Sequence, residues 1–238
     1  MRNTIIFGAS SYYELSELIK DINSTLPEKN KINIIGLLDD NESLIGTSIL
    51  GVPVLGRLNH YKEISNCDYY IFGIGSHKTH VLRREILSEL KIDKKKFLTL
   101  IHPSVKIYST SKVGEGCIIH FGSIIFNNTT IGPFTIIMAL TVIGANNLLG
   151  EGCLITSSVS TTNGVKIGSY SFIGTKSAIS ENIEIAPGSK ISMCSHVRKN
   201  TNPGEFIFSQ PSKGVKLLEV SPQLINEWND FKSSNHNS

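Results

Sequence analysis

Residues 117–137 read CIIHFGSIIFNNTTIGPFTII, and an aliphatic residue returns at every sixth position, at Ile119, Ile125, Ile131 and Ile137. The same period extends in both directions along the chain. Counted in sixes, the full column is Ile101, Ile107, Val113, Ile119, Ile125, Ile131, Ile137, Ile143, Leu149, Ile155, Thr161, Ile167, Ile173, Ile179, Ile185, Ile191 and Val197. Such a period matches neither an α-helix, at roughly 3.6, nor a plain strand, at about 2. It is typical of the hexapeptide repeat of a parallel β-helix.

Two further columns accompany the aliphatic one. Two residues before it the side chains are small or β-branched, at Cys117, Ser123, Thr129, Thr135, Thr141, Cys153, Ser171, Ser177 and Ser189. Glycine follows it directly at Gly114, Gly132, Gly144, Gly150, Gly168 and Gly174. The pattern predicts triangular coils of three hexapeptides, with aliphatic side chains inside and small residues where the walls converge. Because one coil cannot bury its own apolar face, stability comes from stacking, and the ends need caps.

The chain before the repeat has a different pattern. Strands are predicted at residues 4–7, 31–38 and 69–74, and amphipathic helices at 12–22 and about 79–90. Strands that end in a glycine turn and lead into a helix are typical of a parallel α/β unit, which binds ligands at the carboxyl ends of its strands. We therefore expect a Rossmann-like domain over 1–98, a β-helix over 99–198, and a C-terminal loop and helix over 199–238. In that last part, a short strand is predicted at 206–208 and a helix at 221–231.

The predicted carboxyl ends of these strands supply six candidate substrate contacts, namely Gly8, Ser10, Asp39, Asp40, Gly75 and Ser76. Gly8 alone is not a dinucleotide fingerprint, because that motif has three glycines and here Tyr12 and Tyr13 occupy positions near the pyrophosphate. A carboxylate after the second strand can accept hydrogen bonds from ribose hydroxyls, although a solvated turn with Asn41 fits equally well. Ser76 can donate to a phosphate from a helix N-terminus, or it can simply cap that helix.

Composition narrows the function classes. The 238 residues carry a net charge of +3, which favours neither a nucleic acid nor a membrane surface as partner. No apolar run is long enough to span a bilayer, and the N-terminus leads directly into a strand, so we expect no membrane insertion and a cytoplasmic protein. The 4 cysteines lack paired spacing. They are expected to be reduced packing residues, and no metal site is expected.

An α/β unit followed by Leu100-Ile101-His102-Pro103-Ser104 and hexapeptide repeats resembles one branch of the hexapeptide acyltransferase superfamily. That branch includes bacterial sialic acid O-acetyltransferases and the N-acetyltransferases of nucleotide-linked 4-amino-4,6-dideoxy sugars. The resemblance covers nearly the whole chain. Besides the hexads, it is carried by Ile5-Ile6-Phe7-Gly8-Ala9-Ser10, Gly36-Leu37-Leu38-Asp39-Asp40, Gly51-Val52-Pro53-Val54-Leu55-Gly56, Phe72-Gly73-Ile74-Gly75 and Gln210-Pro211-Ser212-Lys213.

The resemblance implies a left-handed β-helix, a homotrimer, and an acyl-CoA in the groove between two neighbouring helices. It also implies that the N-terminal domain holds the nucleotide of the sugar. Acetyl-CoA or another acyl-CoA is then the co-substrate, bound by backbone amides of the later coils and by basic side chains near the phosphates. The residues matched to that role are Gly168, Gly174, Lys176 and Lys190, although each lysine also suits a solvated corner.

The chain departs from the family where the family carries its base. A His followed by Asp or Glu is replaced here by Ala145 and Asn146, and a second family His corresponds to Leu154. In one explanation an unprotonated amine attacks without a dedicated base, because positioning suffices. In another, His120 supplies the base, since it follows the inward Ile119 and should point out of the coil, where a neighbouring subunit could face it. In the third the protein binds without catalysing.

Asn146 is a second catalytic candidate, since its amide could donate to the acceptor or to the thioester carbonyl. It could equally stack in an asparagine ladder along the coil turns. We predict an acyl-CoA-dependent N-acyltransferase that acts on the amine of a nucleotide-linked amino-deoxy sugar for a bacterial surface polysaccharide such as O-antigen. A sugar O-acetyltransferase and a non-catalytic trimeric binding module are the alternatives.

Overall fold

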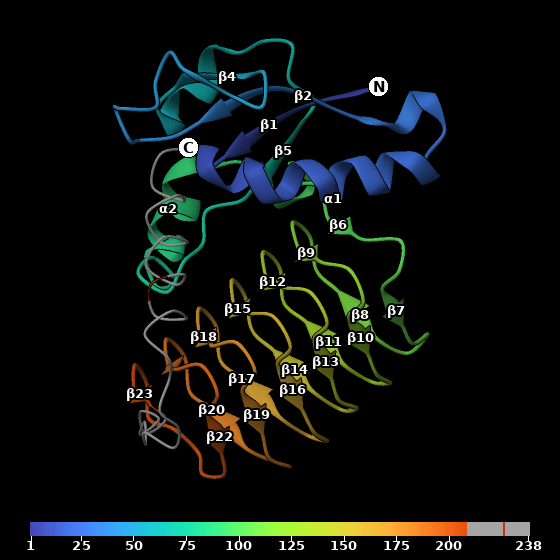
Figure 1. Cartoon of the computed structure of the whole chain (residues 1–238), viewed down its shortest axis with the longest axis vertical. Coiled ribbons are helices and arrows are strands. Elements are labelled where there is room, and N and C mark those ends of the chain that lie inside the picture. The colour runs from blue at the N-terminus through green and yellow to red at the C-terminus, as the bar shows by residue number, and fades with distance from the viewer. Residues whose placement is uncertain (209–225, 227–238) are drawn as a thin grey trace.

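The computed structural model describes residues 1–208 and Asn226, and it shows an α/β unit on one side of a long parallel β-solenoid (Figure 1). The helix expected at 221–231, apart from Asn226, and the segment Gln210-Pro211-Ser212-Lys213 lie outside the described residues.

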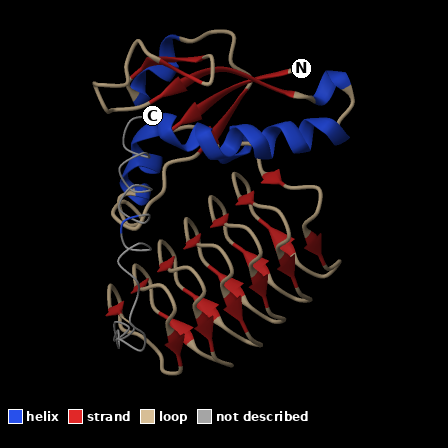
Figure 2. Cartoon of the chain, in the orientation of Figure 1, coloured by secondary structure: helices blue, strands red, loops and turns tan. Residues whose placement is uncertain are grey.

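Three parallel sheets form the walls of the solenoid, and each full coil adds one strand to each wall (Figure 2). The first wall contains β6 (Leu100–Ile101), β9 (Ile118–Ile119), β12 (Ile136–Ile137), β15 (Leu154–Ile155), β18 (Phe172–Ile173), β21 (Lys190–Ile191) and β23 (Phe206–Ile207). The second contains β7 (Lys106–Ile107), β10 (Ile124–Ile125), β13 (Val142–Ile143), β16 (Ser160–Thr161), β19 (Ala178–Ile179) and β22 (His196–Val197). The third contains β8 (Lys112–Val113), β11 (Thr130–Ile131), β14 (Leu148–Leu149), β17 (Lys166–Ile167) and β20 (Glu184–Ile185). Residues three hexapeptides apart lie side by side, as Ile119, Ile137 and Ile155 do, so the predicted parallel β-helix is confirmed.

The aliphatic column fills the interior of the solenoid. From Ile119 to Val197 every member is at most 3 % exposed. In the first coil Ile101, Ile107 and Val113 are only partly buried, because that coil has a neighbour on one side only. Full burial of one such side chain contributes about 1.5–3 kcal/mol, so each coil that stacks on the next stabilises the solenoid.

The small-residue column links each coil to the next through hydrogen bonds. Thr129 Oγ1 donates to the Gly144 carbonyl at 2.7 Å, and Ser177 Oγ donates to the Ser192 carbonyl at 2.8 Å. Serine, threonine and cysteine suit these positions because they are small and each carries one donor.

The glycine column has a steric cause. A Cβ atom on Gly144 would lie 2.2 Å from the carbonyl oxygen of Thr162. A Cβ atom on Gly150 would lie 2.5 Å from the backbone nitrogen of Ser169. Adjacent coils therefore approach too closely at these positions for any side chain.

The N-terminal unit is built on a five-stranded sheet with the order β3-β4-β2-β1-β5. Its strands are β1 (Arg2–Phe7), β2 (Ile32–Leu38), β3 (Ser48–Ile49), β4 (Val52–Gly56) and β5 (Tyr69–Phe72). Its helices are α1 (Tyr12–Thr25) and α2 (Arg83–Leu90), with 3-10 turns at Ala9–Ser11, Glu28–Asn30, Leu58–Glu63 and Lys94–Lys96. All pairs are parallel except β3 with β4. No helix within residues 1–208 or at Asn226 combines the length and the apolar character needed to cross a membrane.

The prediction from the sequence did not include two of these strands, and it placed the start of the second helix too early. The sequence shows no signal for β3 and β4, because β3 is only two residues long and Pro53 interrupts the alternation in β4. The second helix begins at Arg83 and not near Thr79, because the Thr79 hydroxyl closes a separate turn by accepting the Ser76 N–H at 3.0 Å.

Helix α1 lies between the N-terminal sheet and the solenoid (Figure 1). Its apolar side chains share one buried cluster with outward residues of the first wall, namely Leu15, Leu18, Ile19 and Ile22 with Leu100, Ile118, Ile136 and Leu154. The matching positions of the third wall, which α1 does not cover, include Lys112, Thr130, Lys166 and Glu184. The first wall is therefore apolar where α1 covers it, whereas the third wall is mostly polar at these positions, with the exposed Leu148 as an exception.

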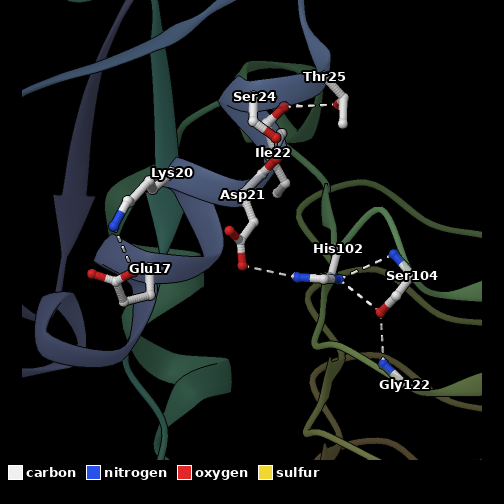
Figure 3. A network of polar contacts seen from close by, with 9 residues as sticks. All are labelled: Glu17, Lys20, Asp21, Ile22, Ser24, Thr25, His102, Ser104 and Gly122. Carbon is white, nitrogen blue, oxygen red and sulfur yellow. Dashed lines mark hydrogen bonds and ion pairs between the residues drawn. The ribbon is translucent and has the colours of Figure 1, made fainter.

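His102 fixes α1 against the first coil (Figure 3). Its Nε2 atom lies 3.0 Å from Asp21 Oδ2, and its Nδ1 atom accepts the Ser104 N–H at 3.0 Å. The Ser104 hydroxyl in turn accepts the Gly122 N–H at 2.9 Å. This series of polar contacts thus connects α1 to two successive coils.

Candidate active site

A cavity of about 780 Å³ lies between the α/β unit and the first wall of the solenoid. On one side it is lined by the first turn of α1 and by the loops that follow β1, β2 and β5. On the other side its lining comes from successive coils, at Ile118, His120, Ile136, Met138, Leu154, Ile155, Thr156, Ser157, Phe172 and Thr175. The carboxyl ends of three parallel strands therefore face a largely apolar wall that also carries hydroxyl and imidazole groups.

The structure brings together all six predicted substrate contacts. Gly8, Ser10, Asp39, Asp40, Gly75 and Ser76 all line this cavity, and His120 joins them from the solenoid. The parallel sheet explains the grouping, because the carboxyl ends of its strands meet at one edge.

Asp39 and Asp40 both accept hydrogen bonds from the backbone. Asp39 accepts the Ala9 N–H at 2.8 Å and the Asn41 N–H at 2.9 Å, one on each carboxylate oxygen. Asp40 Oδ1 accepts the Leu58 N–H at 2.9 Å. The turn with Asn41 is therefore real, and both carboxylates also line the cavity, so the two interpretations of these residues are compatible.

Gly8 has a structural reason to be glycine. Its φ of +94° is one that side chains rarely adopt, and a Cβ atom there would lie 2.8 Å from Ile74 Cγ1. The residue therefore lets the loops after β1 and β5 approach each other at the edge of the cavity.

Ser76 does not lie at a helix N-terminus, and that part of the prediction is wrong. The N-cap of α2 is Leu82, which makes no side-chain cap bond. Ser76 Oγ lies 3.0 Å from Thr79 Oγ1 and accepts the Lys78 N–H at 3.2 Å. Ser76 and Thr79 thus belong to a separate turn that lines the cavity.

His120 points out of the coil, but it faces α1 of its own chain. The α/β unit of the same chain covers this wall at His120, and a contact with a neighbouring subunit stays a prediction. The residue is 6 % exposed, and its Nδ1 atom lies 3.9 Å from Glu14 Oε1. Burial, helped by the proximity of His102, lowers the pKa of His120 from 6.5 to about 4, so the imidazole is neutral near pH 7.

Asn146 lies away from the cavity, at the corner between β13 and β14. It has a φ of +59° and takes part in a row of amides. Its Oδ1 atom accepts a hydrogen bond from Asn128 Nδ2 at 3.2 Å, and its Nδ2 atom donates to Asn163 Oδ1 at 2.7 Å. The structure therefore contains the asparagine ladder and does not bring Asn146 to His120, so a catalytic role for Asn146 stays a prediction.

Gly168 lines a second cavity, of about 570 Å³, on the third wall. Lys166, Ser169 and Pro187 also line it. A Cβ atom on Gly168 would lie 2.5 Å from the backbone nitrogen of Pro187, so the stacking of coils is sufficient to require this glycine. Among the described residues, no group of three His, Cys, Asp or Glu side chains is placed to hold a metal ion.

The other three predicted cofactor contacts lie elsewhere in the single chain. Gly174 follows β18 on the first wall, and Lys176 occupies the next corner with a φ of +58°. Lys190 lies on β21, where its Nζ atom is 5.3 Å from the centre of the Phe206 ring. Within residues 1–208, neither of the two cavities described above contains Gly174, Lys176 or Lys190, and the role of these residues in binding acyl-CoA stays a prediction.

Sequence reasoning missed several residues that line the first cavity. Glu14 lies in the first turn of an ordinary amphipathic helix and gives no signal of its own. Met138 and Thr156 directly follow inward residues of the aliphatic column, as His120 does. That shared position was a usable signal, since it predicts a row of side chains along the first wall.

No protein-family model and no curated relative matches the chain. Several solved structures do. A mutant of perosamine N-acetyltransferase from Caulobacter crescentus, in complex with CoA and GDP-perosamine, is 19 % identical with a TM-score of 0.72 over 90 % of this chain and 96 % of that one. The acetyltransferase domain of PglB from Neisseria gonorrhoeae, in complex with acetyl coenzyme A, is 20 % identical with a TM-score of 0.73 over 90 % and 99 %. WeeI from Acinetobacter baumannii is 22 % identical with a TM-score of 0.73 over 90 % and 99 %. At these identities the likeness shows the fold, and the resemblance drawn from the sequence is confirmed at that level.

Proposed function

We propose that the protein is an acyl-CoA-dependent N-acyltransferase that transfers an acyl group, in the simplest case acetyl, to the amine of a nucleotide-linked amino-deoxy sugar. The observation that carries this proposal is the cavity in which the six predicted substrate contacts and His120 meet. The names of the structural neighbours support it, because one was solved with CoA and GDP-perosamine and another with acetyl coenzyme A. In this proposal the α/β unit is a Rossmann-like nucleotide-sugar-binding domain, and the solenoid is a left-handed β-helix.

The reaction joins the amine nitrogen to the thioester carbonyl carbon. The C–N bond forms in a tetrahedral intermediate, and the C–S bond breaks when this intermediate collapses to the amide. An acceptor that arrives as an ammonium loses one proton before attack and a second after it. One of these protons is left on the CoA thiol and the other goes to solvent.

The pKa of His120 favours an amine over a hydroxyl as acceptor. A hydroxyl must lose its proton during attack, which requires a base whose pKa is close to the working pH. A pKa of about 4 makes His120 too weak for that task. The nitrogen of the tetrahedral intermediate carries a positive charge, which makes it a much stronger acid than an acceptor hydroxyl. The neutral His120 is therefore able to take its proton.

We infer a homotrimer in which an acyl-CoA lies between two solenoids and contacts Gly168, Gly174, Lys176 and Lys190 from more than one chain. Asn146 is the candidate donor to the acceptor or thioester carbonyl in that interface. The cytoplasm, in a pathway to a surface polysaccharide such as O-antigen, is the proposed setting.

The test is thiol release from acetyl-CoA with a panel of UDP- and dTDP-linked 4-amino-4,6-dideoxy sugars, GDP-perosamine, and the 4-hydroxy counterparts, using wild type and His120→Gln. Turnover with an amino sugar and none with its hydroxy counterpart is the expected result. A loss of about 10²–10⁴-fold in His120→Gln would make His120 the base, whereas unchanged turnover would mean that positioning is sufficient. Absence of turnover across the panel in a protein that still binds acetyl-CoA would overturn the proposal.

A further inference from the structure

The first cavity has an unusual charge for a site that receives a sugar nucleotide. Its lining contains three carboxylates, from Glu14, Asp39 and Asp40. Within residues 1–208, no lysine or arginine lines it. The cavity therefore attracts a cation more strongly than a neutral group. The strength of this attraction depends on which of the three carboxylates is free to bind the cation.

Two of the three carboxylates are already engaged. Asp39 accepts backbone N–H groups on both of its oxygens, and Asp40 accepts one from Leu58. Glu14 differs, because its carboxylate accepts no hydrogen bond from any residue that the structure describes. Its side chain is 55 % exposed at the edge of the cavity, so a ligand can reach it.

The nearest polar group to Glu14 is His120, and the pair is not an ion pair near pH 7. Glu14 Oε1 and His120 Nδ1 are 3.9 Å apart, beyond hydrogen-bonding distance. The His120 ring is buried in the cavity wall, and it makes no hydrogen bond with the part of the chain that is described. Because the imidazole is neutral, it does not compensate the charge of Glu14.

We propose that Glu14, with His120 beside it, binds the reacting amino group of the acceptor as an ammonium, and that this contact makes the cavity select an amine over its hydroxyl counterpart. The inference rests on the proposed acyltransferase function, which it deepens by naming the group that chooses the acceptor. An ammonium has three donors. It can bond the Glu14 carboxylate and the lone pair on a His120 ring nitrogen together, whereas a hydroxyl has a single proton to donate.

The electrostatics of the surrounding groups agree with this role. Partial burial raises the pKa of Glu14, because loss of hydration disfavours the charged carboxylate, and a bound cation favours that charged form. His102, on the first coil, acts electrostatically on His120, and its own partner is Asp21 on α1. They bond each other at 3.0 Å and so are already satisfied.

Once bound, the ammonium must lose a proton before it can attack. Glu14 accepts that proton and passes it to solvent at the exposed edge of the cavity, which leaves the free amine between the two side chains. The C–N bond then forms and the C–S bond breaks as described above, with the second proton taken by His120 and returned to the thiolate. Atoms and charge balance, and one proton is released in each turnover.

The experiment measures binding without any acyl donor. The dissociation constants of each amino sugar in the panel and of its 4-hydroxy counterpart are determined by calorimetry for wild type, Glu14→Gln and Glu17→Gln. Glu17 is the matched control, because it lies on the same helix, pairs with Lys20 at 3.2 Å and does not line the cavity. Wild type and Glu17→Gln should prefer the amine by about five- to tenfold, and Glu14→Gln should lose that preference while binding the hydroxy sugar as before.

The outcomes separate this inference from the proposed function. If Glu14→Gln keeps the preference for the amine, the role of Glu14 is refuted while the acyltransferase proposal stands. If wild type binds no member of the panel, the proposed function fails and takes this inference with it. A second readout repeats the calorimetry in buffers of different ionisation enthalpy, which gives the number of protons released on binding. Binding of the acceptor as an ammonium releases no proton, whereas binding as a free amine releases one.

Discussion

The guanidinium of Arg83 donates to the backbone carbonyl of Phe134, and this bond ties α2 to the solenoid across 51 residues of chain. A second donor of the same group bonds the carbonyl of Ile74, at the edge of the first cavity. The group also lies 4.9 Å from the centre of the Phe72 ring. Burial lowers the pKa of Arg83 to about 10, so the side chain is still charged near pH 7.

We predict that Arg83→Ala destabilises the protein by roughly 3–5 kcal/mol. The substitution removes the donor from the buried bond to the Phe134 carbonyl and from the partly buried bond to the Ile74 carbonyl, and it opens a void. Arg83→Met should cost clearly less, because it keeps most of the volume and removes the cost of burying a charge. Urea unfolding of the two variants checks this. Equal losses would mean that the two hydrogen bonds, which both variants lack, dominate over the void.

A second prediction concerns Thr161, the one member of the aliphatic column that is not aliphatic. Its Oγ1 atom accepts hydrogen bonds from Asn147 Nδ2 at 2.5 Å and from the Gly144 N–H at 3.0 Å. Asn147 stands in the small-residue column and accepts the Val165 N–H at 2.7 Å. The two exceptions to the repeat therefore compensate each other inside the solenoid.

Thr161→Val should cost about 1–3 kcal/mol, because it leaves the buried amide of Asn147 without an acceptor. Adding Asn147→Thr should recover part of that loss, since a threonine in this column can accept a backbone N–H as Thr135 does from Cys153 at 3.3 Å. The measurement is a double-mutant cycle by urea unfolding, with an expected coupling of about 0.5–3 kcal/mol. Additive losses would show that the two residues act separately.

Part of the fold and part of the candidate site can be predicted from the sequence. The hexads predict the solenoid, its inward column and its small-residue column, because a strict period constrains every coil in the same way. The grouping of the six candidate substrate contacts in one cavity is also predictable, since they follow parallel strands. The solenoid residues that face these contacts are not predictable. The hexad period is the same on all three walls, so it does not show which wall the α/β unit covers. The sequence alone therefore does not place His120 opposite α1, and it does not single out Glu14.

The low pKa of His120 predicts an acid-sensitive fold. Its pKa is about 4 in the folded protein, against an ordinary value of 6.5, so the unfolded chain binds more protons between these limits. Stability is then full above about pH 6.5 and is lost as the pH falls toward about 4, by at most about 3 kcal/mol. His120→Gln should remove that part of the pH dependence, measured as the free energy of unfolding at both ends of the window. His60→Gln is the control, because His60 is partly exposed and faces Glu63 at 3.3 Å. A wild-type profile no steeper than that of His120→Gln would contradict the assignment.

The position of Asn146 predicts a structural effect that can be told apart from a catalytic one. Asn146→Ala removes two side-chain hydrogen bonds and leaves a non-glycine residue at a φ of +59°, so it should cost about 1–2 kcal/mol of stability. Asn128→Ala is the matched variant, because Asn128 has a φ of +57° and belongs to the same ladder. If the ladder is the whole role, both variants should unfold more easily and keep the wild-type rate of thiol release per folded molecule. A loss of about 10²–10³-fold in thiol release in Asn146→Ala alone would instead identify its amide as a donor in the reaction, supplied at a contact between chains.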